Sequence, residues 1–160
     1  MTTATEREWV EAIGKPAFDC IEQMVDAATL DWERFEELKE AADDPDVKYS
    51  EWEDRDEYEE LRAAAGDCDD EEGAQRHIDE DPLSVELGGW WSPGSDPEAT
   101  EYRVLLCTGG PAVRIVGDLG LHGEACSARL EVQDWFKPWT EYGCDEDILL
   151  EYVSRLYLGD

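Results

Sequence analysis

The chain has 160 residues with 43 acidic and 13 basic side chains, which gives a formal net charge of −30. It lacks the Lys and Arg footprint that direct binding to nucleic acid or to an anionic membrane requires, so the expected partner is a basic protein surface. Hydrophobic residues still make up 41% of the chain, with seven Trp, six Tyr and three Phe, which predicts a folded body rather than a disordered acidic tail.

The cysteines and the hydropathy pattern indicate where in the cell the protein is located. The five cysteines are an odd number and no two of them form a C-x-x-C pair, a usage that favours reduced thiols. The N-terminal segment has neither the basic nor the apolar stretch of a signal peptide, and no segment approaches 18 consecutive apolar residues. These features predict a cytoplasmic protein that does not span a membrane.

The sequence divides into an acid-rich helical region, 1–80, and a strand-rich region, 81–160. The first holds 28 acidic and 8 basic side chains, and the second holds 15 and 5. We expect the two regions to form one compact body of the α+β class, with acidic N-terminal helices and a four-stranded antiparallel sheet covered by a C-terminal helix.

Helix signals follow one another through the first region. Thr5 with Glu8 forms a capping box for a first short helix that Gly14 ends, and Pro16 is well placed to open a second helix. The apolar residues of the second helix recur with the spacing of one buried stripe. They are Phe18, Ile21, Met24, Val25 and Ala28.

The next two helices carry most of the acids. Asp31 is placed to cap a third helix. Its inward-facing residues are Trp32, Phe35 and Leu38. Ser50 with Glu53 predicts a capping box for a fourth helix, 51–65, which Gly66 ends.

After a fifth short helix that ends near Ile78, the apolar period changes to two, which is typical of half-buried strands. Four strands are expected, over residues 83–87, 102–107, 112–119 and 128–133. Short turns such as 108–111, Thr-Gly-Gly-Pro, connect them, so they should form an antiparallel meander. Asp145 is placed to cap a last helix that covers the sheet with Ile148, Leu149, Tyr152, Val153 and Leu156.

No motif indicates catalysis or a metal site. Cys126 lies four residues beyond His122, but a buried or half-buried thiol is the simpler interpretation than a nucleophile. The acid-rich segment 67–73 fails the calcium-loop template, because Glu72 stands at its glycine and Ile78 at its final glutamate. Carboxylate pairs are too abundant to indicate acid/base chemistry. We therefore expect no enzyme, no cofactor and no metal.

The acidic helices are the most distinctive feature of the sequence. Residues 51–60 carry seven acids and one Arg. As a helix they would present about one net charge per 2.5 Å, against about one per 1.7 Å in duplex DNA. Two alternatives remain: a charged helix face is usually only solvated, and an acidic, lysine-poor chain also suits a high-salt cytoplasm. The candidate partner-binding carboxylates are Glu33, Glu36, Glu37, Glu40, Glu53, Asp56, Glu57 and Glu60.

Tryptophans gather after two of the predicted strands. One group is Trp90 and Trp91, and the other contains Trp135 and Trp139. The simpler interpretation is that both groups close one end of the core. The alternative is an exposed patch through which the protein forms a homodimer.

Four segments of the second region carry a family resemblance. They read Asp-Pro-Leu-Ser-Val-Glu at 81–86, Leu-Leu-Cys-Thr-Gly-Gly-Pro-Ala-Val-Arg-Ile at 105–115, Gln-Asp-Trp at 133–135 and Pro-Trp-Thr-Glu-Tyr at 138–142. In these segments the chain resembles an acidic family of proteobacterial phages, plasmids and integrated elements, over roughly residues 78–158. The resemblance brings no catalytic residues. It implies a bacterial host cytoplasm and, by analogy, an anti-defence role such as that of anti-CRISPR and DNA-mimic antirestriction proteins.

These observations lead to one principal hypothesis and two alternatives. The protein is expected to inhibit a host nucleic-acid-binding defence complex, most plausibly a CRISPR surveillance complex, by docking its acidic helices on the basic surface that holds nucleic acid. The first alternative is an accessory or chaperone-like acidic binding module of a mobile element, without defence inhibition. The second is an enzyme that uses Cys126 or clustered carboxylates.

Overall fold

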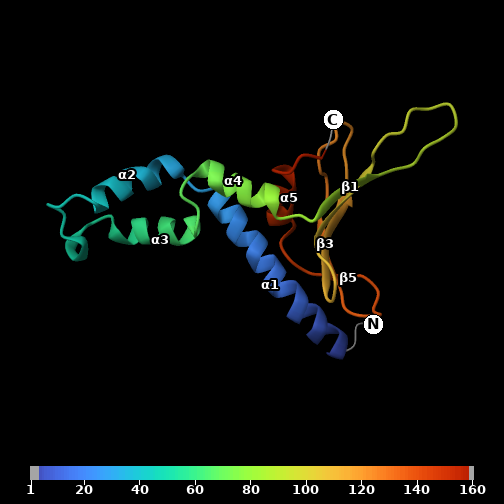
Figure 1. Cartoon of the computed structure of the whole chain (residues 1–160), viewed down its shortest axis with the longest axis horizontal. Helices are drawn as coiled ribbons and strands as arrows, with labels where there is room; N and C mark the ends of the chain where they lie inside the picture. Colours follow the sequence, from blue (N-terminus) through green and yellow to red (C-terminus); the bar gives the residue numbers. More distant parts are fainter. Residues whose placement is uncertain (1–3, 159–160) are drawn as a thin grey trace. The chain divides into compact units, whose positions relative to one another are not determined.

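The computed structural model describes residues 4–158 and contains five α-helices and a five-stranded antiparallel sheet (Figure 1). The predicted α+β class is confirmed. The helices are α1 (Ala4–Ala28), α2 (Trp32–Ala42), α3 (Arg55–Ala65), α4 (Glu71–Glu80) and α5 (Glu146–Ser154), and a short 3₁₀ turn (Tyr49–Glu51) precedes α3. The strands are β1 (Ser84–Gly88), β2 (Glu101–Cys107), β3 (Ala112–Asp118), β4 (Arg129–Gln133) and β5 (Thr140–Tyr142).

The chain forms two compact units. The sheet unit comprises the residues up to Glu22 and those from Ile78 onward, so it contains all five strands, α5 and most of α1. The helical unit, Gln23–His77, contains α2, α3 and most of α4. Both boundaries fall inside helices, one in α1 and one in α4.

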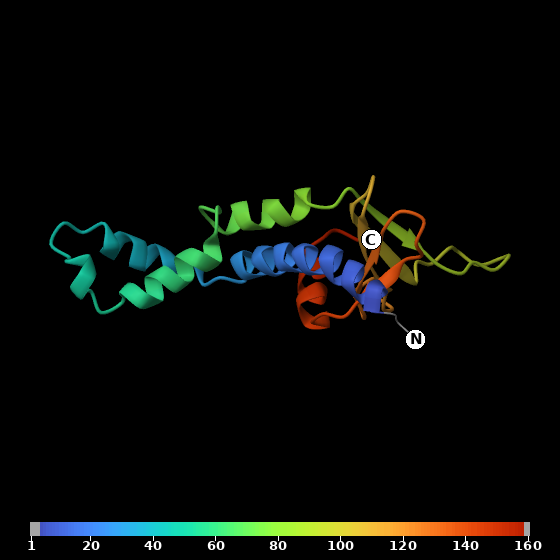
Figure 2. The same ribbon diagram turned by 90° about the horizontal axis from the view of Figure 1, so that it is seen from below.

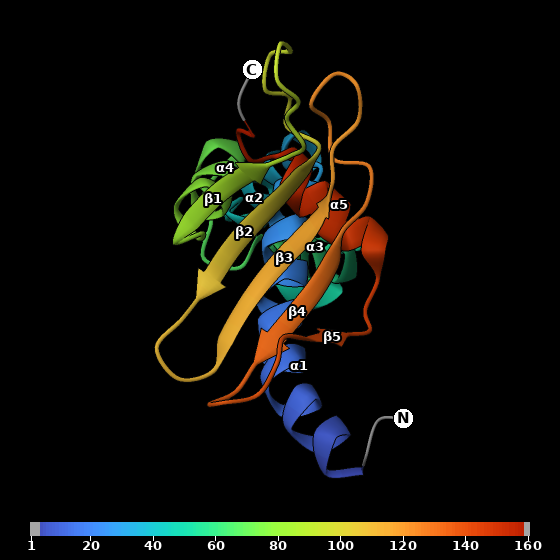
Figure 3. The same cartoon turned by 90° about the vertical axis from the view of Figure 1, so that its right-hand side faces the viewer.

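The sheet is a meander in the order β1-β2-β3-β4-β5, with every neighbouring pair antiparallel (Figure 3). Because opposed residues share a face, the register places alternate residues of each strand on one apolar face. The buried residues of this face are Tyr102, Val104, Val113, Ile115, Leu130 and Val132. The helix α5 covers the same face (Figure 3), and its residues Leu149, Tyr152 and Val153 are almost completely buried.

The prediction of four strands is wrong, because a fifth strand completes the sheet. In β5, Tyr142 lies opposite Leu130 and Thr140 lies opposite Val132. The strand has only three residues, so an alternation of period two cannot be recognised in it.

Gly14 and Pro16 do not break the first helix, contrary to the sequence prediction. The helix α1 runs without interruption from Ala4 to Ala28, which also places Thr5 inside the helix rather than at its cap. A Cβ atom at Gly14 would collide with the ring of Tyr142 in β5. The glycine therefore permits a close approach of α1 to the sheet, and this tertiary contact overrides the local stop signal.

The helices α2 and α3 lie side by side in the helical unit (Figure 2). As predicted, Asp31 caps α2: its carboxylate accepts a hydrogen bond of 3.0 Å from the backbone N–H of Arg34. The three predicted inward-facing residues of α2 are all buried. The predicted start of α3 is wrong, because residues 49–51 form a 3₁₀ turn and the helix begins at Arg55, so the Ser50 and Glu53 capping box does not form. Gly66 ends α3 as predicted, with a φ of 58°.

A long-range hydrogen bond ties α5 to the segment before β1. The hydroxyl of Tyr152 donates to Asp81 at 2.5 Å, across 71 residues of sequence. Burial raises the pKa of Tyr152, and the hydrogen bond to Asp81 raises it further. The helix itself begins where the sequence predicted, since Asp145 accepts a hydrogen bond of 3.0 Å from the backbone of Asp147.

Candidate protein-binding surfaces

The acidic surface of the helical unit is supported by a short stack of aromatic rings. Phe35 of α2 stacks on Tyr58 of α3, with ring centroids 5.9 Å apart and planes 11° apart. Trp32 packs edge-on against Phe35 at 5.7 Å, and Trp52 lies 5.7 Å from Tyr58. Such ring pairs stabilise a structure beyond the area they bury. They allow α2 and α3 to pack together although both carry many like charges.

One ion pair joins the two acidic helices. Arg34 of α2 donates to both carboxylate oxygens of Glu57 in α3, from Nε at 2.9 Å and from Nη2 at 3.1 Å. It also donates to Glu37, one turn along α2, at 3.3 Å. The hydrogen bond from Arg34 lowers the pKa of Glu57, and the two carboxylates raise the pKa of Arg34. Glu57 therefore helps to hold α2 and α3 together, whereas Glu37 contacts Arg34 within α2.

The remaining candidate carboxylates form longer ion pairs or, in the part of the chain that the structure describes, none. Glu36 lies 4.0 Å from Lys39, and Asp56 lies 3.5 Å from Arg55. In residues 4–158, no ion pair involves Glu33, Glu40, Glu53 or Glu60. All eight candidates are exposed. The prediction that Glu53 lies on the same helix as Asp56, Glu57 and Glu60 is wrong, because Glu53 precedes α3.

Charge is denser on the helical unit than on the sheet unit. Residues 23–77 hold 21 acidic and six basic side chains, a net charge of −15. The other 105 residues also carry a net charge of −15, from 22 acidic and seven basic side chains. The charge density of the helical unit is thus about twice that of the rest of the chain.

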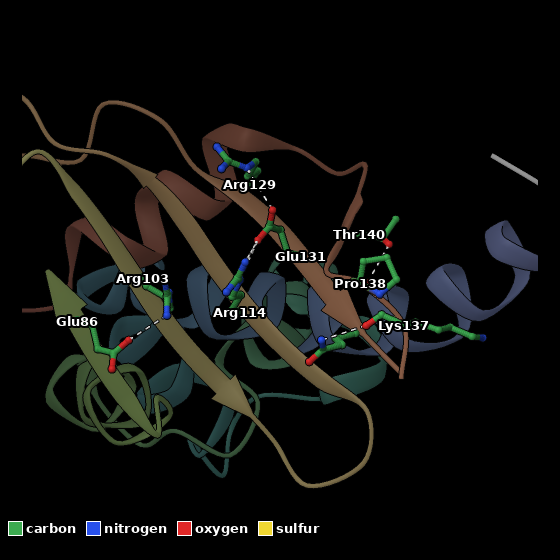
Figure 4. A network of polar contacts seen from close by, with 9 residues as sticks. Glu86, Arg103, Arg114, Arg129, Glu131, Lys137, Pro138 and Thr140 are labelled. Atoms are coloured by element: carbon green, nitrogen blue, oxygen red, sulfur yellow. Dashed lines mark hydrogen bonds and ion pairs between the residues drawn. The ribbon is translucent and has the colours of Figure 1, made fainter. Parts of the chain in front are cut away.

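The sheet presents a second polar surface on the face opposite α5. Arg103, Arg114 and Arg129 stand there on neighbouring strands (Figure 4). They line a hollow of about 560 Å³, whose acidic lining residues are Glu86, Glu101, Asp118 and Glu131. With four acids against three arginines, the hollow does not favour an anion.

The three arginines of this face are already engaged. Arg114 donates to Glu131 at 2.8 Å and its guanidinium lies 4.1 Å from the ring centroid of Trp139. Arg129 approaches the same glutamate at 3.5 Å, and Arg103 approaches Glu86 at 3.4 Å. This cluster of three arginines was not predicted from the sequence. A signal was present, because each arginine occupies a polar position between apolar neighbours in a predicted strand.

The two tryptophan groups do not close one end of the core, so that interpretation is wrong. Trp90 is 92% exposed, Trp91 60% and Trp135 63%, while Trp139 is half-buried against Arg114. The first group follows β1 and the second follows β4. These strands run in opposite directions, so the groups lie at opposite ends of the sheet (Figure 3). They form two separate patches rather than one, and homodimerisation through either of them stays a prediction.

The second patch includes an unusual turn. Phe136 is fully exposed and has a φ of 61°. This is the left-handed backbone region, which few residues other than glycine adopt. Its neighbour Lys137 turns back, with Nζ 4.5 Å from the ring centroid of Trp9 in α1. The turn thus presents Trp135 and Phe136 to solvent.

The cysteines and histidines offer little for catalysis. Cys68 and His77 are in contact, with Sγ 3.6 Å from Nδ1. Burial and the charge of Asp67 raise the pKa of Cys68, and burial raises that of Cys144 to about 11. A raised pKa keeps a thiol protonated, whereas a nucleophilic cysteine needs the opposite shift. Cys126, expected to be at least half-buried, is exposed. Within residues 4–158, no cluster of three or more His, Cys, Asp or Glu residues is arranged to hold a metal ion.

The chain matches no protein-family model, no curated protein and no solved structure. Among the described helices, none has the length and apolar character needed to cross a membrane.

Proposed function

We propose that this protein is an acidic inhibitor that docks α2 and α3 on the basic, nucleic-acid-binding surface of a partner complex. The observation that carries the proposal is the charge of the helical unit, which holds 21 acidic against six basic side chains. Four acids lie on each of α2 and α3, two helices that aromatic rings hold together. Like charges three and four residues apart weaken a helix. A fold that maintains them at this density is suited to a surface rich in Lys and Arg.

The carboxylates without an ion pair are the groups expected to contact the partner. Glu33, Glu40 and Glu60 lie on the exposed surfaces of α2 and α3 and have no ion pair within the described chain. Cations of a partner can reach them without breaking an internal interaction. Exposed attractions of this kind act over about 8–10 Å at physiological ionic strength, so association should be fast and sensitive to salt.

The identity of the partner rests on the family resemblance. Small acidic proteins of phages and mobile elements commonly counter host defence, and CRISPR effector complexes hold nucleic acid in positively charged channels. We therefore propose a CRISPR surveillance complex of the bacterial host as the target, and the cytoplasm as the location.

Phage infection tests this function directly. A phage sensitive to CRISPR immunity is plated on CRISPR-active and CRISPR-null hosts, each with and without the protein. Restored plaquing on the CRISPR-active host alone is expected. Unchanged plaquing, together with equal binding of the protein to many unrelated basic proteins, would instead support the accessory-module alternative.

A further inference from the structure

The exposed apolar side chains of the described chain are concentrated in one short segment. Five of the ten large hydrophobic residues that are exposed in residues 4–158 fall between positions 83 and 91. They are Leu83, Val85, Leu87, Trp90 and Trp91. The segment comprises Leu83, β1 and the start of the β1–β2 connection. We call the whole connection, residues 89–100, the arm. Clustered exposed apolar groups mark interaction sites more often than isolated ones.

The strand β1 forms one edge of the sheet. It pairs only with β2, so the backbone groups on its other side have no strand partner in the described chain. Val85 lies opposite Val104 and Leu87 opposite Tyr102. Their side chains therefore extend the apolar face of the sheet beyond the part that α5 covers. A free backbone edge beside exposed apolar side chains is a template for a further strand.

The arm is an ordered structure that presents a tryptophan. Its base is closed by a hydrogen bond of 2.9 Å from the backbone of Thr100 to Gly88. Within it, the indole N–H of Trp91 donates to the carbonyl of Ser95 at 2.9 Å. Trp90, beside it, is almost fully exposed. A Trp side chain has only two rotatable bonds, so it loses little conformational freedom on binding, and Trp is enriched among the residues that dominate interfaces.

The charge around this surface defines the partner. Residues 79–101 contain seven acidic side chains and no basic one. A second copy of the chain is a poor occupant, because each copy carries −30 and a symmetric antiparallel pairing centred on Glu86 would oppose two Glu86 side chains. The same repulsion opposes edge-to-edge pairing of β1 strands from two copies. The complementary occupant is an extended segment that carries Lys or Arg.

We propose that β1 and the arm form a strand-docking surface for an extended segment of a basic partner protein. The segment adds a sixth strand to the sheet beside β1, places apolar side chains over Val85 and Leu87, and offers an apolar pocket to Trp90. Its basic side chains lie near Glu86 and the acids of the arm. The inference rests on the proposed function for the basic character of the partner, and it adds a second, backbone-mediated contact.

The test uses a synthetic peptide of alternating Val and Lys residues, added to the full chain labelled for amide NMR. The peptide should shift the amide signals of Ser84–Gly88 and the indole N–H signal of Trp90. Two further peptides carry the same charge but are N-methylated at either the valines or the lysines, which removes donors from one edge. At least one of the two should bind ten-fold more weakly. Equal binding of all three peptides would overturn strand pairing.

Substitutions in the protein locate the contact. Leu87→Lys and Trp90→Ala should each weaken the peptide at least five-fold, whereas the control Leu121→Lys, in an exposed turn elsewhere in the sheet unit, should not. Shifts confined to α2 and α3 would overturn the strand-docking proposal and leave the proposed function intact. Shifts at β1 in a protein that fails to protect phage would instead overturn the proposed function alone.

Discussion

Arg34 in α2 and Glu57 in α3 form a bidentate ion pair, with nitrogen-to-oxygen distances of 2.9 and 3.1 Å. The pair joins two helices whose other charged side chains mostly repel each other. Glu57 is therefore different from its unpaired neighbour Glu60, because it contributes to the fold as well as to the acidic surface.

Replacement of Arg34 by Gln should lower the urea midpoint of unfolding more than replacement of Arg76 by Gln. Arg76 makes one contact of 3.4 Å to Glu72 on its own helix, whereas Arg34 joins two helices. Both substitutions make the net charge more negative by one, so the added repulsion is matched. Equal midpoints for the two variants would show that the interhelical pair does not stabilise the fold.

The same pair predicts a pH dependence. The pKa of Glu57 is lowered from 4.5 in the folded protein, so the stability that the pair provides is present above pH 4.5 and is lost as the pH falls through the lower folded value. The difference in unfolding free energy between the wild type and Arg34→Gln should therefore shrink as the pH falls below 4.5. A difference that stays constant down to pH 2 would contradict the assignment.

Tyr152→Phe should destabilise the sheet unit by about 1.5–3 kcal/mol, because it removes a hydrogen bond to the carboxylate of Asp81. Tyr102→Phe is the matched control. Its hydroxyl donates to the uncharged carbonyl of Ser127 at 2.6 Å, and its loss should cost about 0.5–1.5 kcal/mol. Urea titrations at pH 7 measure both, and a larger effect at Tyr102 would be the contrary result.

The raised pKa of Tyr152 predicts that its contribution to stability changes at alkaline pH. A folded pKa above the unfolded value of 10 means that the stabilisation is complete below pH 10 and is lost as the pH rises beyond it. The stability advantage of the wild type over Tyr152→Phe should therefore decrease above pH 10.

Gly14→Ala should destabilise the protein although Ala normally favours a helix by about 1 kcal/mol. The added methyl group would collide with the ring of Tyr142, and such overpacking costs about 1–3 kcal/mol. In a thermal unfolding series, the double variant Gly14→Ala with Tyr142→Ala should lose less than the sum of the single variants. A stabilising Gly14→Ala would show that the close approach of α1 and β5 is not required.

Gly14 also shows where the sequence could not predict the fold. The strands β1 and β4 were predictable because apolar and polar residues alternate in them, and β2 and β3 because they lie on either side of the Gly-rich turn at 108–111. The continuity of α1 was not, because Gly14 and Pro16 are local stop signals and the contact that overrides them involves Tyr142, 128 residues away. The helix start at Arg55 was missed because Ser50 and Glu53 satisfy a capping-box pattern that the 3₁₀ turn pre-empts.

The surfaces were predictable to different degrees. The exposure of the acids on α2 followed from the buried positions Phe35 and Leu38, which fix the opposite face of the helix. The ion pair between Arg34 and Glu57 could not be predicted from the sequence, because it depends on how α2 and α3 pack. The separation of Trp90 from Trp135 could have been inferred, since successive strands of a meander alternate in direction and these residues follow its first and fourth strands.

The proposed function requires the unpaired carboxylates of the helical unit to contact a basic, nucleic-acid-binding surface. Two variants test it, each of which changes the net charge from −30 to −22 with four substitutions to Lys. The first replaces Glu33, Glu40, Glu53 and Glu60, and leaves Glu57 in place because it holds Arg34. The control replaces exposed acids of the sheet unit at Glu8, Glu11, Glu141 and Asp147.

The most direct measurement is the competition of each protein with labelled target DNA for a purified CRISPR surveillance complex, at two salt concentrations. The wild type and the sheet-unit control should displace the DNA, less effectively at higher salt. The helical-unit variant, shown by circular dichroism to be folded, should need at least a hundred-fold higher concentration. A folded helical-unit variant that displaces DNA as well as the wild type would contradict the account.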